Sequence, residues 1–200
     1  MKVNLKYYRD YWQDIKDSTM NTIGKNTGKY PTSEWKHKLL LSEHSPIRKL
    51  KISWKWIDLK SWVSVHLVRH KVGIEHFVSS QRTDRTGIDR NKLPQDSLVN
   101  HECEADAQAL INISRKRLCN CASLETRQAW QEVKNKVLEV EPELASCMVK
   151  ECVYRNGLCP EMFPCGYNKT RAFEKELKDY LETKKDNIND KTNIFLKGDK

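Results

Sequence analysis

The chain has 200 residues, 38% of them apolar, and a formal net charge of +9. That length suits one domain burying about 70% of its unfolded surface, and the charge favours anionic partners such as nucleotides or nucleic acid. No apolar run approaches the roughly 18 residues of a membrane-spanning helix and the N-terminus lacks a signal-peptide core, so we expect a soluble protein of the cytoplasm, or of the host cytoplasm if the chain is viral.

The first quarter of the chain predicts helices followed by a strand. Residues 5–23 have the pattern of an amphipathic helix, residues 24–31 are typical of a loop, and residues 34–42 indicate a short helix. Residues 50–57 alternate between apolar and polar side chains, which predicts a half-buried strand. The apolar positions of that strand are Leu50, Ile52, Trp54 and Trp56.

A helix is predicted directly after this strand. Asp58 can cap it, and Trp62 and Val65 follow at helical spacing. The segment Arg69-His70-Lys71 would then lie on the last turn, where the helix dipole favours cations.

Three more helices are predicted in the second half of the chain. The first covers residues 104–121, the second is capped by Ser123 and runs to about residue 139, and the third has Pro142 in its first turn. We expect a single domain over residues 1–183, which includes a cysteine-rich extension at residues 145–170. The polar, lysine-rich residues 184–200 predict a frayed tail.

The segment from Leu67 to Arg85 carries the densest functional signal. Arg69, His70 and Lys71 end an apolar stretch, and two serines and two arginines follow, namely Ser79, Ser80, Arg82 and Arg85. Cations and hydroxyls joined by a short connection can hold a phosphate and orient a polar ring. A solvated basic loop is the alternative, because most charge runs are exposed.

This segment resembles the signature of the flavin-dependent thymidylate synthases, which reads Arg-His-Arg, seven or eight residues, then Ser-x-Arg. Here Arg69-His70-Lys71 is followed by eight residues and then by Ser80-Gln81-Arg82, so Ser80 is favoured over Ser79 as the family serine. Three flanking blocks resemble the family in the same order. They are Glu43-His44-Ser45-Pro46, Asp89 to Pro94, and Asp106 to Asn112 with Arg117 five residues later.

The chain also departs from the family pattern at several positions. Lys71 replaces the third motif residue, an arginine, and so lacks a planar fork of donors. The other departures are Arg48-Lys49 for Glu-His, Phe77-Val78 for Asn-Glu, Asp106 for Asn, Gln108 for Arg and Cys121 for His. We therefore expect a compact, diverged member of the family, with a phage origin left open.

The resemblance implies an α+β fold with a mixed sheet packed by long helices. It also implies a homotetramer that uses FAD to convert dUMP to dTMP, with methylenetetrahydrofolate and NADPH as co-substrates. The implied cofactor-binding residues are Arg69, His70, Lys71 and Asn112. The implied substrate-binding residues are Ser79, Ser80, Gln81, Arg82, Arg90 and Arg117, of which Ser80 and Arg117 are also implied to be catalytic. Read without the resemblance, Asn112, Arg117 and Arg90 could be ordinary surface residues.

The seven cysteines raise a separate question. An odd number of cysteines in a chain without a secretion signal argues against a disulfide framework. Four of them, Cys147, Cys152, Cys159 and Cys165, fall in one short stretch and could hold a structural zinc ion. Their spacing lacks a Cys-x-x-Cys pair, so buried free thiols are the favoured reading.

Two other functions stay open from the sequence. The substitutions around the motif are compatible with a related enzyme that acts at the same uracil carbon, for example by hydroxymethylation. The charge of +9 and the cysteines are compatible with a basic, non-catalytic nucleic-acid-binding protein.

Overall fold

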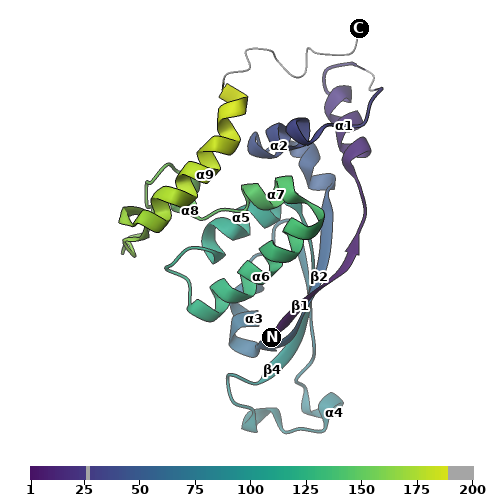
Figure 1. The fold of residues 1–200 in the computed structure, drawn as a ribbon. Coiled ribbons are helices and arrows are strands. Elements are labelled where there is room, and N and C mark those ends of the chain that lie inside the picture. The colour runs from purple at the N-terminus through teal and green to yellow at the C-terminus, as the bar shows by residue number, and fades with distance from the viewer. Residues whose placement is uncertain (26–27, 189–200) are drawn as a thin grey trace.

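A computed structural model describes residues 1–25 and 28–188. Helices pack on one face of a single sheet, which Figure 1 presents nearly edge-on. The strands are β1 (Lys2–Tyr8), β2 (Lys51–Lys60), β3 (Ile74–Val78) and β4 (Leu98–Asp106). The α-helices are α1 (Trp12–Asn21), α2 (Ser33–Leu41), α3 (Ser61–Leu67), α4 (Thr83–Thr86), α5 (Ala107–Arg117), α6 (Leu124–Val140), α7 (Pro142–Cys147), α8 (Glu151–Tyr154) and α9 (Arg171–Ile188). Short 3-10 helices are η1 (Ser45–Lys49), η2 (Arg90–Lys92) and η3 (Tyr167–Lys169).

The four described strands are arranged in the order β1-β2-β4-β3, and each neighbouring pair is antiparallel. The predicted α+β class is confirmed, although the described pairings are all antiparallel where a mixed sheet was expected. Trp54 of β2 lies opposite Cys103 of β4, and His76 of β3 lies opposite Cys103 on the other side. Strand β4 therefore lies between β2, which carries Trp54, and β3, which follows the basic segment Arg69-His70-Lys71 in the sequence.

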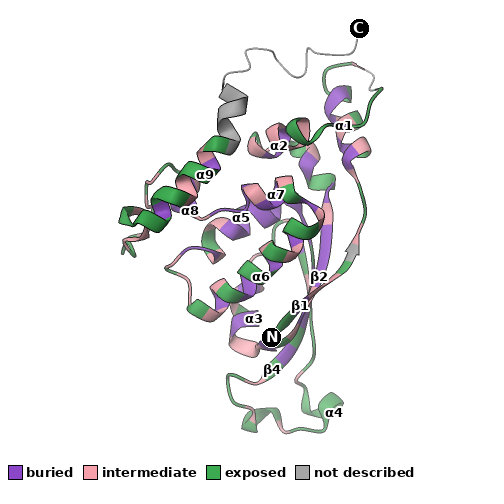
Figure 2. Ribbon diagram, in the orientation of Figure 1, coloured by how far each residue is buried: buried purple, intermediate pink, exposed green. Residues whose placement is uncertain are grey.

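The core lies between the inner face of this sheet and helices α5 and α6 (Figure 2). Trp54 packs edge-on against Trp56 and against Trp130 of α6, with ring centroids 5.4 and 5.9 Å apart. The indole N–H of Trp56 donates to the Ala129 carbonyl at 3.0 Å, and that of Trp130 donates to Ser114 Oγ at 2.8 Å. Two of the three indole donors are thus satisfied on burial, whereas the N–H of Trp54 has no hydrogen-bond partner within the described residues. This core fixes α5 relative to the sheet.

Two predicted helix starts, one predicted helix and one predicted strand are confirmed. Ser123 caps α6 by accepting the backbone N–H of Thr126 at 3.4 Å, and Pro142 lies in the first turn of α7. The predicted helix at residues 34–42 corresponds to α2, and the predicted strand at residues 50–57 corresponds to β2.

Three boundary predictions were wrong. The helix expected at residues 5–23 begins only at Trp12, because Lys2–Tyr8 instead completes the sheet by pairing with β2. Asp58 lies within β2 with φ 56°, and α3 begins three residues later. The helix expected at residues 104–121 begins only at Ala107, because β4 continues to Asp106, and it ends at Arg117. In each case strand pairing across the sheet outweighs the local helical pattern.

The C-terminal part forms a second apolar cluster beside the first. Val149, Cys152, Val153, Phe173 and Tyr180 are its buried members. Helix α9 continues to Ile188, so the first residues of the predicted tail are helical, and residues 189–200 lie outside the described residues. The single-domain organisation stays a prediction. Within the described ranges, no helix combines the length and apolar character needed to cross a membrane.

Candidate functional site

The basic motif Arg69-His70-Lys71 lies in the connection between α3 and β3. Gly73 closes this connection with φ +72°, and a Cβ there would lie 2.6 Å from Oδ2 of Asp106. The backbone N–H of Asp106 donates to the Gly73 carbonyl at 2.9 Å, and its carboxylate caps α5 by accepting the N–H of Ala109 at 2.8 Å. Asp106 therefore ties the connection to the N-terminus of α5.

Arg117, at the C-terminal end of α5, reaches the same connection. Its Nε donates to Nε2 of His70 at 2.7 Å, and its Nη2 donates to the carbonyl oxygen of His66 at 2.9 Å. Two sequence blocks 47 positions apart are thus joined by direct hydrogen bonds. This contact unites two of the residues to which the sequence assigned binding roles.

The contact also fixes the protonation state of His70. Because Nε2 accepts a hydrogen from Arg117, the ring proton of a neutral His70 lies on Nδ1. Burial, followed by the positive charge of Arg117 and by His76, lowers the pKa of His70 to about 4. His70 is therefore neutral at pH 7, and its Nδ1–H can donate to a ligand.

The surroundings of Arg117 carry excess positive charge. Burial, and then the charge of Arg69, lowers the pKa of Arg117 from its usual value. Arg69 and Lys71 are exposed, and no carboxylate in the described part of the chain forms an ion pair with Arg69, Lys71 or Arg117. A half-buried site with uncompensated cations favours an anionic ligand.

The Glu43-His44-Ser45-Pro46 block contacts a different face of α5. Glu43 accepts a hydrogen bond from Gln108 at 2.6 Å and pairs with Arg115. Asn112 is exposed, and its Oδ1 accepts hydrogen bonds from Gln108 and Arg115 at 3.3 and 3.1 Å. Arg115 also stacks on the Tyr154 ring at 3.6 Å. Sequence reasoning missed Arg115, although its spacing of three and seven from Asn112 and Gln108 places all three on one helix face.

The second half of the motif lies at the far end of β3. Ser79 pairs with Asn100, Ser80 Oγ accepts the N–H of Arg82 at 3.2 Å, and Gln81 donates to Ser97 at 2.7 Å. Residues 79–97 form an arm, containing α4 and η2, that projects from the end of the sheet (Figure 1). The five residues of β3 span about 16 Å, so this arm lies well away from His70 within one chain.

The arginines of the arm are exposed. Arg82 forms a two-point ion pair with Asp84, at 3.0 and 2.7 Å, and Arg90 uses its backbone N–H to contact Thr83 at 3.2 Å. The side chains of α4 and η2 are not buried (Figure 2). The structure therefore brings Arg69, His70 and Lys71 together with Arg117, and it does not bring Ser80, Arg82 and Arg90 to them.

The four cysteines that the sequence offered as alternative zinc ligands are only partly brought together. Cys152, Cys159 and Cys165 line a small cavity with Cys119, whereas Cys147 is buried in the main core. Within the described residues, the cluster whose ligand atoms are close enough to share a metal ion is a different one, His76, His101 and Cys103. Sequence reasoning missed this cluster. The available signal was the spacing of two between His101 and Cys103, which places both side chains on one face of a strand.

Comparisons with known proteins identify the fold. No family model matches the chain, and no curated protein matches its sequence. A solved structure of flavin-dependent thymidylate synthase ThyX from Helicobacter pylori, complexed with FAD and dUMP, is 13% identical and superposes with a TM-score of 0.60 over 75% of this chain and 100% of that chain. A second structure of that enzyme with FAD and dUMP gives 13% identity and a TM-score of 0.59, over 74% of this chain and 99% of that chain.

A third solved structure extends this fold to another reaction. It is the UMP/dUMP methylase PolB from Streptomyces cacaoi, bound with 5-Br dUMP. It is 14% identical, with a TM-score of 0.57 over 74% of this chain and 97% of that chain. The chain therefore has the fold of the flavin-dependent thymidylate synthases, as the sequence motifs predicted.

Proposed function

We propose that the chain is an enzyme that modifies C5 of a pyrimidine nucleotide, as a flavin-dependent thymidylate synthase that converts dUMP to dTMP. The observation that carries this proposal is the contact of Arg117 with His70, next to Arg69 and Lys71, with which no described carboxylate forms an ion pair. These residues belong to two separate blocks of the resemblance, and the fold brings them to one place. If the cations only formed a diffuse basic surface, there would be no reason for residues of two separate blocks to contact each other at a neutral, half-buried histidine.

The cluster suits an anionic flavin cofactor. Arg69 and Lys71 would face the phosphates or the electron-rich edge of the ring, and the Nδ1–H of His70 would donate to a ring acceptor. Asn112, which the resemblance also implies to bind the cofactor, lies on the face of α5 that carries Gln108 and Arg115, and so it is not part of this cluster within one chain. When FAD is bound, it supplies the hydride taken from NADPH, while methylenetetrahydrofolate supplies the carbon. The chain's own contribution is to orient these groups and to stabilise negative charge.

The nucleotide would be held by Arg117 and by the arm. Arg117 can polarise a uracil carbonyl, which stabilises negative charge on the ring while the C5 hydrogen leaves as a proton. Ser79, Ser80, Gln81, Arg82 and Arg90 supply the hydroxyl, amide and cationic donors that a phosphate requires. Because β3 separates the arm from Arg117, we propose that each site combines the arm of one chain with the Arg117 region of another, in a homotetramer.

The experiment that tests this function is a turnover assay with dUMP carrying tritium at C5. The purified protein is incubated with FAD, NADPH and methylenetetrahydrofolate, and both tritium release and the product mass are measured. We expect tritium release that depends on FAD, with a product heavier than dUMP by one CH2 unit, because a methyl group replaces the C5 hydrogen. Parallel reactions with UMP test the ribonucleotide. A hydroxymethylated product would favour the related reaction, and no release from either nucleotide by folded protein would overturn the proposal.

A further inference from the structure

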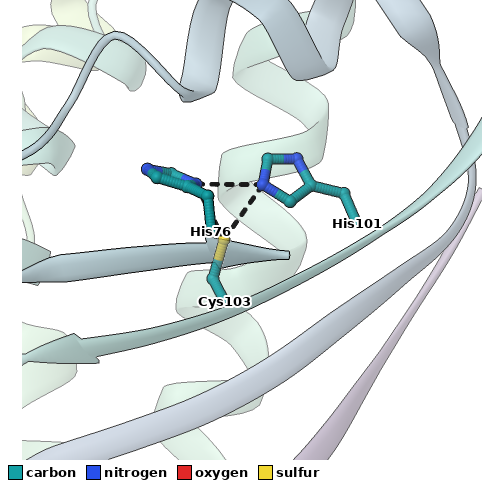
Figure 3. Close-up of side chains that lie close together, drawn as sticks. All are labelled: His76, His101 and Cys103. Carbon is teal, nitrogen blue, oxygen red and sulfur yellow. Dashed lines mark hydrogen bonds between the residues drawn. The ribbon is translucent and has the colours of Figure 1, made fainter. Parts of the chain in front are cut away.

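His76, His101 and Cys103 form a compact cluster on the inner face of the sheet (Figure 3). Nδ1 of His76 lies 2.9 Å from Nε2 of His101, and Sγ of Cys103 lies 3.1 and 3.2 Å from these two nitrogens. His101 and Cys103 are each 0% exposed, and His76 is half-buried. Three atoms with metal-binding lone pairs thus meet at one point in the protein interior.

The outer nitrogen of each histidine is held by a partner on the far side of its ring. Nε2 of His76 lies 2.8 Å from the carbonyl oxygen of His70, which can only accept, so the proton of His76 lies on Nε2 and its Nδ1 lone pair faces the cluster. Nδ1 of His101 lies 3.1 Å from Oγ of Ser64. Metal-binding histidines commonly have their second nitrogen oriented by a carbonyl or another polar group in this way.

Hydrogen bonds alone satisfy the cluster incompletely. Ser64 can donate to His101, and His101 can then donate to His76. In that arrangement the lone pair of His76 Nδ1 is used and Nε2 of His101 carries a hydrogen, so the thiol hydrogen of Cys103 faces no free nitrogen acceptor. If His101 instead donates from Nδ1 to Ser64, the lone pairs of His76 Nδ1 and His101 Nε2 face each other at 2.9 Å with one thiol hydrogen between them. A metal ion instead uses all three lone pairs at once.

We propose that His76, His101 and Cys103 bind one divalent zinc-type ion. Two imidazoles and a thiolate are a ligand set that zinc favours, with the fourth tetrahedral position left to a non-protein ligand. Zinc bonds of about 2.0–2.3 Å separate tetrahedral ligands by about 3.3–3.7 Å, so each separation has to widen by about half an ångström or less. The Cys103 thiol releases its proton to solvent as it binds.

The ion would restrict the motion of the segment Arg69-His70-Lys71 through His76. His76 is hydrogen-bonded to the His70 carbonyl, and His70 accepts from Arg117. Fixing His76 to an ion would therefore fix the connection that carries Arg69, His70 and Lys71. This inference stands apart from the proposed reaction, because metal binding can be measured without turnover.

The test uses the full chain, stripped of metal and titrated with Co²⁺, whose absorption spectrum contains a sulfur-to-metal charge-transfer band only when a thiolate binds. We expect one ion per chain with that band, competition by Zn²⁺, and a rise in Tm on binding. Cys103→Ser should abolish the band, and His76→Gln should weaken binding by more than about tenfold. His76 is half-buried on an edge strand, so its variant should fold even if Cys103→Ser does not.

Cys159→Ser is the matched control, since Cys159 lines the separate cavity with Cys119, Cys152 and Cys165. It should leave the band and the affinity unchanged. The proposal is overturned if folded wild-type protein binds no Co²⁺ stoichiometrically, if His76→Gln binds as tightly as wild type, or if the band disappears in Cys159→Ser while remaining in Cys103→Ser. The last result would place the ion among the cysteines.

Discussion

Arg117 shows how one side chain connects distant parts of the sequence. It uses two different guanidinium nitrogens, held in a fixed planar arrangement, to contact His70 and the His66 carbonyl. The sequence predicted that Arg117 and His70 both take part in binding. It could not predict that they touch, because the contact depends on how α5 packs against α3 and the sheet.

Lys71 is the residue at which the motif departs most clearly from the family pattern. Replacing it by arginine restores a planar fork beside Arg69 and His70. If the pocket keeps the family geometry, Lys71→Arg should preserve or improve affinity for FAD, because a second parallel hydrogen bond becomes available. Equilibrium binding of FAD to the two proteins decides this. A loss of tenfold or more in the variant would indicate a pocket rebuilt for another ligand.

At the scale of elements, the connection between α3 and β3 depends on Gly73. Its φ of +72° strains any residue with a Cβ, and the Asp106 carboxylate would lie 2.6 Å from that Cβ. Gly87 has a matching φ of +71° but open space around it. We expect Gly87→Ala to cost about 1–2 kcal/mol from backbone strain alone. Gly73→Ala should cost clearly more, because Asp106 must also move.

Urea unfolding of the two glycine variants measures this difference. Equal losses in the free energy of unfolding would mean that Asp106 does not pack tightly against the connection. A smaller loss for Gly73→Ala than for Gly87→Ala would contradict the packing of the motif on α5.

The junction of α6 and α7 contains a buried carboxyl group, Glu141. The indole N–H of Trp12 donates to both of its oxygens at 2.9 Å, and the Tyr8 hydroxyl donates to it as well. Burial raises the pKa of Glu141 in spite of these donors. A raised pKa in the folded state means that the folded protein holds this proton more tightly than the unfolded chain. The contribution of Glu141 to stability is therefore present at low pH and is lost as the pH rises through its unfolded and then its folded pKa.

Glu141→Gln removes this titration while keeping an acceptor for Trp12. As the pH rises above the ordinary glutamate pKa of about 4.3, the difference in unfolding free energy between wild type and Glu141→Gln should become less favourable to wild type. Urea unfolding at several pH values measures it. A difference that is flat, or that grows in favour of wild type, would contradict the raised pKa.

Local patterns predicted elements well where one periodicity dominated. Ser123 and Pro142 marked the starts of α6 and α7, and the alternation from Leu50 to Ile57 marked β2. The other three strands were missed or taken for helix, because each is stabilised by pairing with a distant strand. The His76, His101 and Cys103 cluster was missed for the same reason, since it exists only once β3 lies beside β4.

At the scale of the whole molecule, the proposed site is divided between two regions. Arg117 and His70 lie beside one end of β3, and Arg90 lies on the arm beyond the other end. If each site combines the arm of one chain with the Arg117 region of another, two inactive variants should complement each other. Mixing Arg90→Ala with Arg117→Ala under subunit exchange should restore activity to roughly a quarter of wild type if chains assort at random.

The individual variants and a mixture without subunit exchange are the controls for complementation. Activity in the exchanged mixture that does not exceed that of the separate variants would mean that Arg90 and Arg117 serve the same chain's site, or that one of them has no role in it.

The central claim is that the Arg69, His70 and Arg117 region binds a flavin, and titration of the apo-protein with FAD tests it most directly. Quenching of flavin fluorescence should saturate at micromolar concentrations for wild type and for Arg9→Ala, which removes an exposed arginine paired with Asp14. Arg69→Ala should bind FAD about ten- to a hundred-fold more weakly, as expected for losing a charge-assisted contact. Folded wild-type protein that binds no FAD, or equal losses in Arg69→Ala and Arg9→Ala, would contradict the account.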